Sequence, residues 1–172
     1  RTSFPFDYEN DTSALKQLYA LHSLDKVIQG GMNDMSKAVA LMLYTGKFLN
    51  GGTQPGSDTQ SGPSAFLITK NRREKGIGGG SDVYSALMCQ LALSCGMSAR
   101  LVGMHCFDES GKPLTYDICE LFLNDKNKWV AFDPYTRGTY YTTDGMPLSV
   151  LEMHSLVTEN RIREITPVPG IG

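Results

Sequence analysis

The chain has 172 residues, of which 41% are hydrophobic and 20% are charged, and its formal net charge is -2. A chain of this length is expected to fold as one domain over residues 1–172 and to bury about 70% of its unfolded surface. The small net charge and the lack of a basic run argue against nucleic-acid binding. No apolar stretch reaches the roughly 18 residues of a membrane span, so no such span is expected.

Apolar residues at helical spacing dominate the first half of the chain. They predict three helices, which run from a cap at residues 11–13 to about 29, from 33–34 to 49, and from a cap at Ser64 to about 76. The glycine-rich, polar stretch 50–63 predicts a long exposed loop between the second and third of these helices.

A glycine-rich approach then leads into a fourth predicted helix, in the sequence GIGGGSDVYSALMCQLALSCG at residues 76–96. Ser81 and Asp82 are expected to form its cap and first turn, and Gly96 to end it. This places residue 81 at the positive end of a helix dipole, where a nucleophile would be held. The glycines match neither a dinucleotide-binding fingerprint nor a phosphate loop, so no nucleotide cofactor is expected.

After Gly96 the pattern changes to alternation and predicts antiparallel strands at 99–107, 115–123 and 128–132. Alternation places Tyr116 on one face of the second strand and Asp133 on one face of the third, so the two side chains are expected to meet near residue 81. His105 lies on the first strand, and one register would place it across from Tyr116.

The rest of the chain gives weaker signals. Residues 135–141 are rich in tyrosine and threonine and indicate an edge or a covering loop, whereas 166–172 are rich in proline and glycine and indicate irregular structure. Between them, Ser149 is expected to cap a short helix.

The cysteines give no sign of a metal site. No C-x-x-C occurs, no cysteine–histidine spacing fits zinc, and no metal is expected. Cys106 and Cys119 fall on neighbouring predicted strands, and whether they form a disulfide depends on a register that the sequence leaves open.

The order of these elements resembles the transglutaminase-like superfamily, a papain-related cysteine-peptidase architecture, over about residues 64–157. The segment GMSARLV at 96–102 resembles the strand that follows the family's nucleophile helix, and WVAFDP at 129–134 resembles its W-x-x-x-D-P strand. Counting back from Gly96 places the family's cysteine at Ser81. Counting back from Glu120 in the H-x-x-x-E pattern places its histidine at Tyr116, and Asp133 matches the acid of the triad.

The resemblance implies an α+β fold in which N-terminal helices pack on a small antiparallel sheet. In the family a cysteine thiolate, activated by histidine, attacks an amide or ester carbonyl. With serine at 81 and tyrosine at 116, we expect a domain that has lost catalysis and keeps a cleft for binding a peptide, protein or glycan or for docking inside a larger assembly. The alternative is an acyl-transfer enzyme with Ser81 as nucleophile, His105 as base and Asp133 as orienting acid. Similar bacterial domains act in the periplasm, so the resemblance favours an exported protein.

Overall fold

The structure is a computed structural model, and it describes residues 12–52, 64–108 and 110–170. Most of the exposed loop predicted at 50–63 therefore lies outside the described residues. The elements follow one another as α1 (Thr12–Leu21), α2 (Leu24–Ile28), α3 (Asp34–Leu49), α4 (Ala65–Lys75), α5 (Ser81–Ser94), β1 (Ala99–Phe107), β2 (Pro113–Leu123), β3 (Lys128–Asp133), β4 (Gly138–Thr142), α6 (Val150–Thr158), η1 (Ile162–Glu164) and β5 (Ile165–Pro169).

The first predicted helix is wrong as a single element, because it is divided into α1 and α2. Ser23 adopts the left-handed conformation, with φ 49° and ψ 49°, and ends the first helical run. The preceding residue, His22, is only 4% exposed, and its ring nitrogens lie 2.8 Å from Tyr44 Oη and 2.8 Å from Thr69 Oγ1. This buried polar contact, which joins the end of α1 to α3 and α4, accompanies the break at a point where the periodicity alone would continue the helix.

The helices α3 and α4 confirm the sequence patterns closely. A capping box between Asn33 and Ser36 opens α3. Gly76, in the left-handed conformation with φ 66°, ends α4. Ser64 stands at the N-cap position of α4, as expected, but its side chain makes no capping hydrogen bond.

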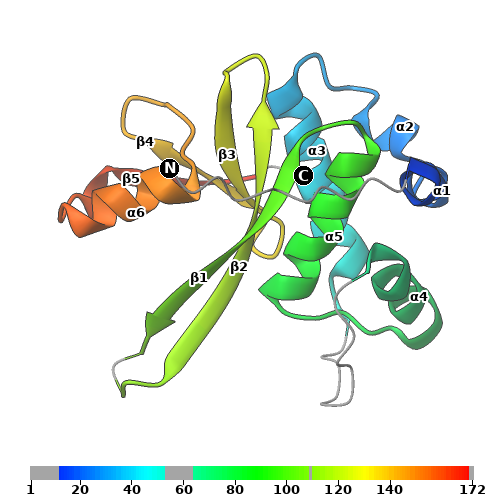
Figure 1. Ribbon diagram of the computed structural model, residues 1–172, viewed down its shortest axis with the longest axis horizontal. Helices are drawn as coiled ribbons and strands as arrows, with labels where there is room; N and C mark the ends of the chain where they lie inside the picture. The colour runs from blue at the N-terminus through cyan, green and yellow to red at the C-terminus, as the bar shows by residue number, and fades with distance from the viewer. Residues whose placement is uncertain (1–11, 53–63, 109, 171–172) are drawn as a thin grey trace, which may run out of the picture.

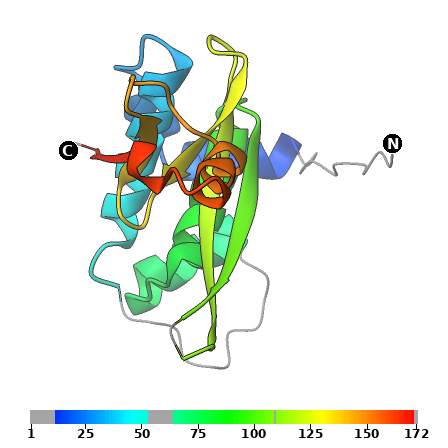
Figure 2. The ribbon, with the colours of Figure 1, turned by 90° about the vertical axis from the view of Figure 1, so that its left-hand side faces the viewer.

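The five strands form one antiparallel sheet in the order β1-β2-β3-β4-β5. Figure 1 shows α1 to α5 on one side of this sheet and α6 on the other. The core lies between α5 and the sheet, where Leu87 and Leu91 of the helix and Leu121 and Phe132 of the strands are all fully buried. Beyond this core the long hairpin of β1 and β2 extends away from the helices (Figures 1 and 2).

The expectations for the C-terminal third need two corrections. The segment predicted as an edge or covering loop forms β4, which lies inside the sheet between β3 and β5. The segment predicted as irregular forms β5, an edge strand, although it contains Pro167 and Pro169. The amide of Gly170 donates to the carbonyl of Arg137, which places the even-numbered residues of β5 in hydrogen-bonded pairs with β4. The nitrogen atoms of Pro167 and Pro169 therefore point away from the sheet, where no hydrogen-bond donor is needed.

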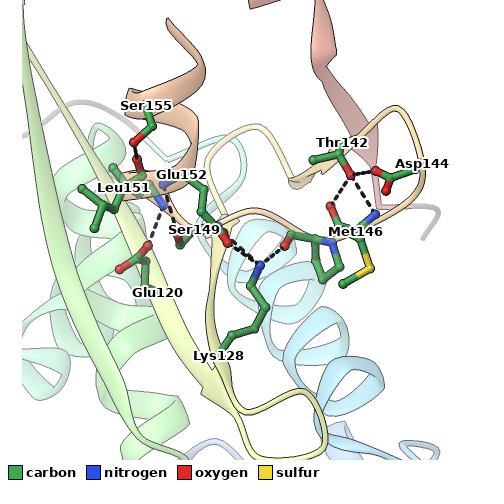
Figure 3. A network of polar contacts seen from close by, with 11 residues as sticks. Glu120, Lys128, Thr142, Asp144, Met146, Ser149, Leu151, Glu152 and Ser155 are labelled. Carbon is green, nitrogen blue, oxygen red and sulfur yellow. Dashed lines mark hydrogen bonds and ion pairs between the residues drawn. The ribbon is translucent and has the colours of Figure 1, made fainter. Parts of the chain in front are cut away.

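The helix α6 is anchored to the second face of the sheet by a buried carboxylate. Glu120 of β2 is 1% exposed, and its Oε1 accepts the backbone amide of Val150 at 2.6 Å in the first turn of α6. Its Oε2 lies 2.6 Å from the guanidinium of Arg100. As Figure 3 shows, Ser149 and Glu152 also close a capping box there, as the predicted cap at Ser149 requires. A carboxylate at the positive end of a helix is favourably placed.

All four cysteines are free. The register pairs Cys106 with Leu114 and Cys119 with Leu101, so the two cysteines point to opposite faces and lie well apart along the hairpin. The structure thus answers the question that the sequence left open, because no disulfide joins Cys106 to Cys119.

Candidate functional site

The N-terminus of α5 is held in place by its glycine-rich approach. The N-cap residue is Gly80 rather than Ser81, and Ser81 is the first residue of the helix. A Cβ atom at Gly78 would lie 3.0 Å from Cα of Gly52, in the segment that follows α3. The two backbone segments can approach this closely only because both residues are glycine. The glycine-rich approach to α5 therefore packs closely against the segment that follows α3.

Ser81 contacts the strand that carries Tyr116. Its Oγ accepts a hydrogen bond from the backbone amide of Asp117 at 3.1 Å. One turn further along α5, Ser85 Oγ donates to the carbonyl of the same residue at 2.9 Å. The first turn of the helix is therefore joined to β2 directly after Tyr116, and the hydroxyl at position 81 is engaged with backbone.

Asp133 is fully buried, and its carboxylate is surrounded by donors. Its Oδ2 accepts the phenol of Tyr116 at 2.8 Å and that of Tyr140 at 3.2 Å. Its Oδ1 accepts the backbone amides of Tyr135 and Thr136 at 3.0 and 3.1 Å. Four hydrogen bonds satisfy most of the capacity of a carboxylate and offset the cost of burying it.

The two phenols that contact Asp133 are held in their protonated form. Burial, together with the hydrogen bond to Asp133, raises the pKa of Tyr116 far above its usual value of 10.0. Burial and the charge of Asp133 raise the pKa of Tyr140 to about 12. At neutral pH both groups act as hydrogen-bond donors to the carboxylate, and neither can take a proton from Ser81.

Three tyrosine rings form a cluster between α5 and the end of β3. The ring of Tyr135 makes edge-to-face contacts with Tyr84, at a centroid distance of 5.1 Å, and with Tyr116, at 6.4 Å. Tyr84 lies three residues after Ser81, on the same side of the helix. Tyr135 remains 45% exposed, so the cluster presents an aromatic surface to solvent next to the buried carboxylate.

The observed register is not the one that would place His105 across from Tyr116. Met104 is the residue across from Tyr116, whereas His105 pairs with Thr115. Because side chains alternate along a strand, His105 lies on the opposite face from Tyr116. Its Nδ1 lies 3.2 Å from Thr115 Oγ1, and among the described residues no hydrogen bond joins it to Ser81.

Charged groups flank the site. Burial and the neighbouring carboxylate of Asp82 raise the pKa of Asp117, an effect that His105 partly opposes.

Within the part of the chain that the structure describes, no group of three or more histidine, cysteine or acidic residues is arranged to hold a metal ion. No described helix is both long and apolar enough to cross a bilayer.

Sequence reasoning missed one member of the site, Tyr140. It contacts Asp133 because β4 lies beside β3 in the sheet, with Phe132 across from Thr139. The only signal in the sequence is the run of tyrosine and threonine after the Asp-Pro strand, a pattern that indicates an edge or a covering loop. Glu120 was named only as the last residue of a pattern, and its contacts with Val150 and Arg100 depend on the fold.

The family model described as the transglutaminase-like superfamily matches residues 22–134. The chain belongs to the transglutaminase-like superfamily. No curated protein matches it. Among solved structures it is similar to the periplasmic domain of TgpA from Pseudomonas aeruginosa bound to ethylmercury, with 15% sequence identity and a TM-score of 0.46. The match covers 78% of this chain and 47% of that one, so the chain corresponds to about half of the TgpA chain.

In this transglutaminase-like chain, the matched residues run from the break after α1 to the Asp-Pro end of β3. They include every helix of the first half apart from α1, together with the first three strands. The α+β class expected from the sequence is confirmed, with helices packed on an antiparallel sheet. Beyond the match, β4 and β5 extend the same sheet, and β4 supplies the second tyrosine at Asp133.

Proposed function

We propose that this chain is a single transglutaminase-like domain that has lost catalysis and binds a peptide or glycan at the site of residues 81, 116 and 133. The observation that carries the proposal is the environment of Asp133. Its carboxylate receives two phenols and two amides, and the position expected for an imidazole holds a phenol. A triad needs a base between nucleophile and acid, and here the group in that place keeps its proton.

The hydroxyl at position 81 supports the same proposal. A serine needs a neighbouring base to become a nucleophile, whereas a thiol is partly ionised near neutral pH. Ser81 Oγ instead accepts a hydrogen bond from the amide of Asp117, which stabilises the hydroxyl as an acceptor. The three histidines of the chain lie in the α1–α2 break, on the outer part of β1 and on α6.

Retained binding is supported by the exposed tyrosine cluster. Tyrosine offers a flat apolar ring and a polar edge, a combination suited to the C–H faces of sugars and to peptide backbones. Tyr135 is half exposed and supported from behind by Tyr84 and Tyr116. A rigid, partly exposed ring beside the N-terminus of a helix is a suitable surface for a neutral, hydrogen-bonding ligand.

Binding is tested by NMR titration with two probes, chitotetraose and a blocked tetrapeptide. One of them is expected to shift the amide signals of residues 81–84 and 135–136. The variant Tyr135→Ala is expected to weaken this binding about tenfold, equivalent to about 1.4 kcal/mol. The control Ile162→Ala removes a side chain that is 60% exposed on η1 and should leave binding unchanged. Shifts confined to other regions, or equal binding by the Tyr135 variant, would refute the proposed binding site.

The alternative is an acyl-transfer enzyme with Ser81 as nucleophile, His105 as base and Asp133 as orienting acid. It has less support, because His105 lies on the face away from Tyr116 and is bonded to Thr115. A fluorophosphonate probe separates the two proposals. We expect no labelling of Ser81 in the intact chain. Rapid labelling that disappears in both His105→Ala and Asp133→Asn would establish the enzyme and end the proposal that catalysis is lost.

A second experiment tests whether only the reactive groups are missing. The variants Ser81→Cys and Ser81→Cys with Tyr116→His are treated with iodoacetamide near pH 7. Because Tyr140 also occupies Asp133 Oδ2, the new imidazole should be poorly oriented, and both variants should react at the rate of an ordinary thiol. A double variant that reacts many times faster than the single one would show that the surrounding site is still arranged for catalysis.

A further inference from the structure

The two edges of the sheet are protected very differently. At one edge, β5 carries Pro167 and Pro169 with their nitrogen atoms turned outward, so it offers few donors to another strand. At the other edge, β1 pairs with β2 without interruption from Ala99 to Phe107, and no described strand pairs with its outer side. Its sequence ARLVGMHCF has no proline and no lysine, which are the residues that usually block an edge.

The outward-facing groups of β1 follow from two hydrogen bonds. The amide of Phe122 donates to the carbonyl of Ser98, and the amide of Asp108 donates to the carbonyl of Lys112. In an antiparallel ladder these contacts place the even-numbered residues of β1 in hydrogen-bonded pairs with β2. The odd-numbered residues 101, 103, 105 and 107 therefore direct their N–H and C=O groups away from the sheet. All four residues are exposed, and their exposed side chains include Phe107 at 75% and Leu101 at 44%.

We infer that β1 is a homodimer interface, in which two copies of this chain join their sheets by antiparallel β1–β1 pairing about a two-fold axis at Met104. This register places residue 101 across from 107 and residue 103 across from 105 of the second copy. Four such pairs, each exchanging two bonds, give about eight hydrogen bonds. Every outward-facing group from 101 to 107 is then satisfied.

The side chains of the strand are complementary to themselves in this register. The two exposed apolar residues, Leu101 and Phe107, face each other across the axis. Gly103 faces His105 of the second copy, and the side chains of Asp117 and His105 of its own chain border this glycine. At the ends, Arg100 faces Asp108, so opposite charges meet, although each group keeps its contacts within its own chain. A two-fold axis at Gly103 instead would place Phe107 across from Ala99, whose side chain is 5% exposed.

A disulfide provides a test of both the dimer and its register. Residues 102 and 106 of opposite copies form a non-hydrogen-bonded pair in this arrangement, with Cα atoms about 4.5 Å apart, a separation that a disulfide can span. Cys106 is exposed and free. The variant Val102→Cys should therefore cross-link to Cys106 of the second copy when oxidised by oxygen with copper phenanthroline. Within one chain the two residues are about 13 Å apart along the strand and cannot join.

The expected result is a covalent dimer for Val102→Cys, and none for the unaltered chain, for Leu101→Cys or for Val102→Cys with Cys106→Ser. The absence of a dimer in the first variant, or its presence in the last, would overturn the inference.

Sedimentation velocity gives an independent measurement that needs no added cysteine. The unaltered chain should dimerise with rising concentration, and Leu101→Lys should weaken the dimer about tenfold, since two apolar cross-strand pairs are lost. The matched control is Val168→Lys on the opposite edge, where Val168 has a similar exposure of 40%. A chain that stays monomeric at millimolar concentration, or a dimer that only the control variant disrupts, would refute the assignment of β1.

Discussion

Acid is expected to destabilise the fold through His22. Burial, with a smaller effect of the nearby Arg73, lowers the pKa of His22 from 6.5 to about 4. The ring is 4% exposed and lies between the hydroxyls of Tyr44 and Thr69. The neutral imidazole can donate with one nitrogen and accept with the other, whereas the protonated ring can only donate. Protonation therefore requires rearrangement of a buried contact that joins three helices.

The sign and size of the effect follow from linkage. Below pH 6.5 the unfolded chain binds a proton at His22 that the folded chain does not bind until the pH approaches 4. The stability that the neutral ring contributes is thus complete above pH 6.5 and is lost as the pH falls from 6.5 to about 4. One pKa unit is worth about 1.4 kcal/mol, so the loss is about 2 kcal/mol by pH 5 and about 3 kcal/mol at most.

The assay is urea denaturation at pH 7.5 and pH 5.0, with the unfolding free energies compared between variants. The variant His22→Gln keeps a polar side chain but cannot be protonated, so it should be less stable at pH 7.5 and lose about 2 kcal/mol less on acidification. The control His154→Gln changes an exposed histidine on α6 and should behave like the unaltered chain. If His22→Gln and the unaltered chain lose the same free energy between the two pH values, the reasoning is wrong.

Two further predictions concern buried carboxylates. Glu120→Gln should cost about 2 kcal/mol of unfolding free energy, because it weakens a charge-assisted contact to the start of α6, whereas Glu159→Gln, on an exposed pair, should have little effect in the same urea titration. Tyr116→Phe should cost about 1.5 kcal/mol and Tyr140→Phe less, because the first phenol lies at 2.8 Å from Asp133 and the second at 3.2 Å. The reverse order in thermal or urea unfolding would contradict the geometry.

The two strands of the first hairpin, β1 and β2, were predictable because the structure that they form is the one that their local sequence pattern favours. The alternation over residues 99–107 gave the bounds of β1 without error. Burial alternates along β1 from Arg100 to Met104, whereas β2 is buried on both faces from Ile118 to Leu121. By contrast, β5 has two prolines in five residues and was predicted to be irregular. Proline costs a ladder hydrogen bond inside a sheet but not at an edge, where its nitrogen faces outward. Whether β5 lies at an edge depends on the order of the strands and not on its own sequence.

The candidate site was predictable in its chain positions but not in its contacts. The resemblance to the family, counted from Gly96 and from Glu120, implied residues 81 and 116, and alternation pointed to the face that carries Asp133. Whether His105 or Met104 lies across from Tyr116 depends on a one-residue difference in register. Tyr140 reaches Asp133 only because the chain returns through β4 beside β3. Neither the register of β1 on β2 nor the position of β4 beside β3 can be recognised from the sequence of the segment concerned.

The environment of Asp133 connects the stability of this domain with its proposed loss of catalysis. A buried carboxylate is costly unless donors surround it, and a catalytic acid receives one of those donors from its imidazole. Here Tyr116 donates instead, and Tyr140 adds a second phenol to the same oxygen. The fold therefore keeps the buried Asp133 fully hydrogen-bonded with tyrosine at position 116. A histidine introduced by Tyr116→His would have to share Oδ2 with Tyr140, so full orientation of that imidazole also requires Tyr140→Phe.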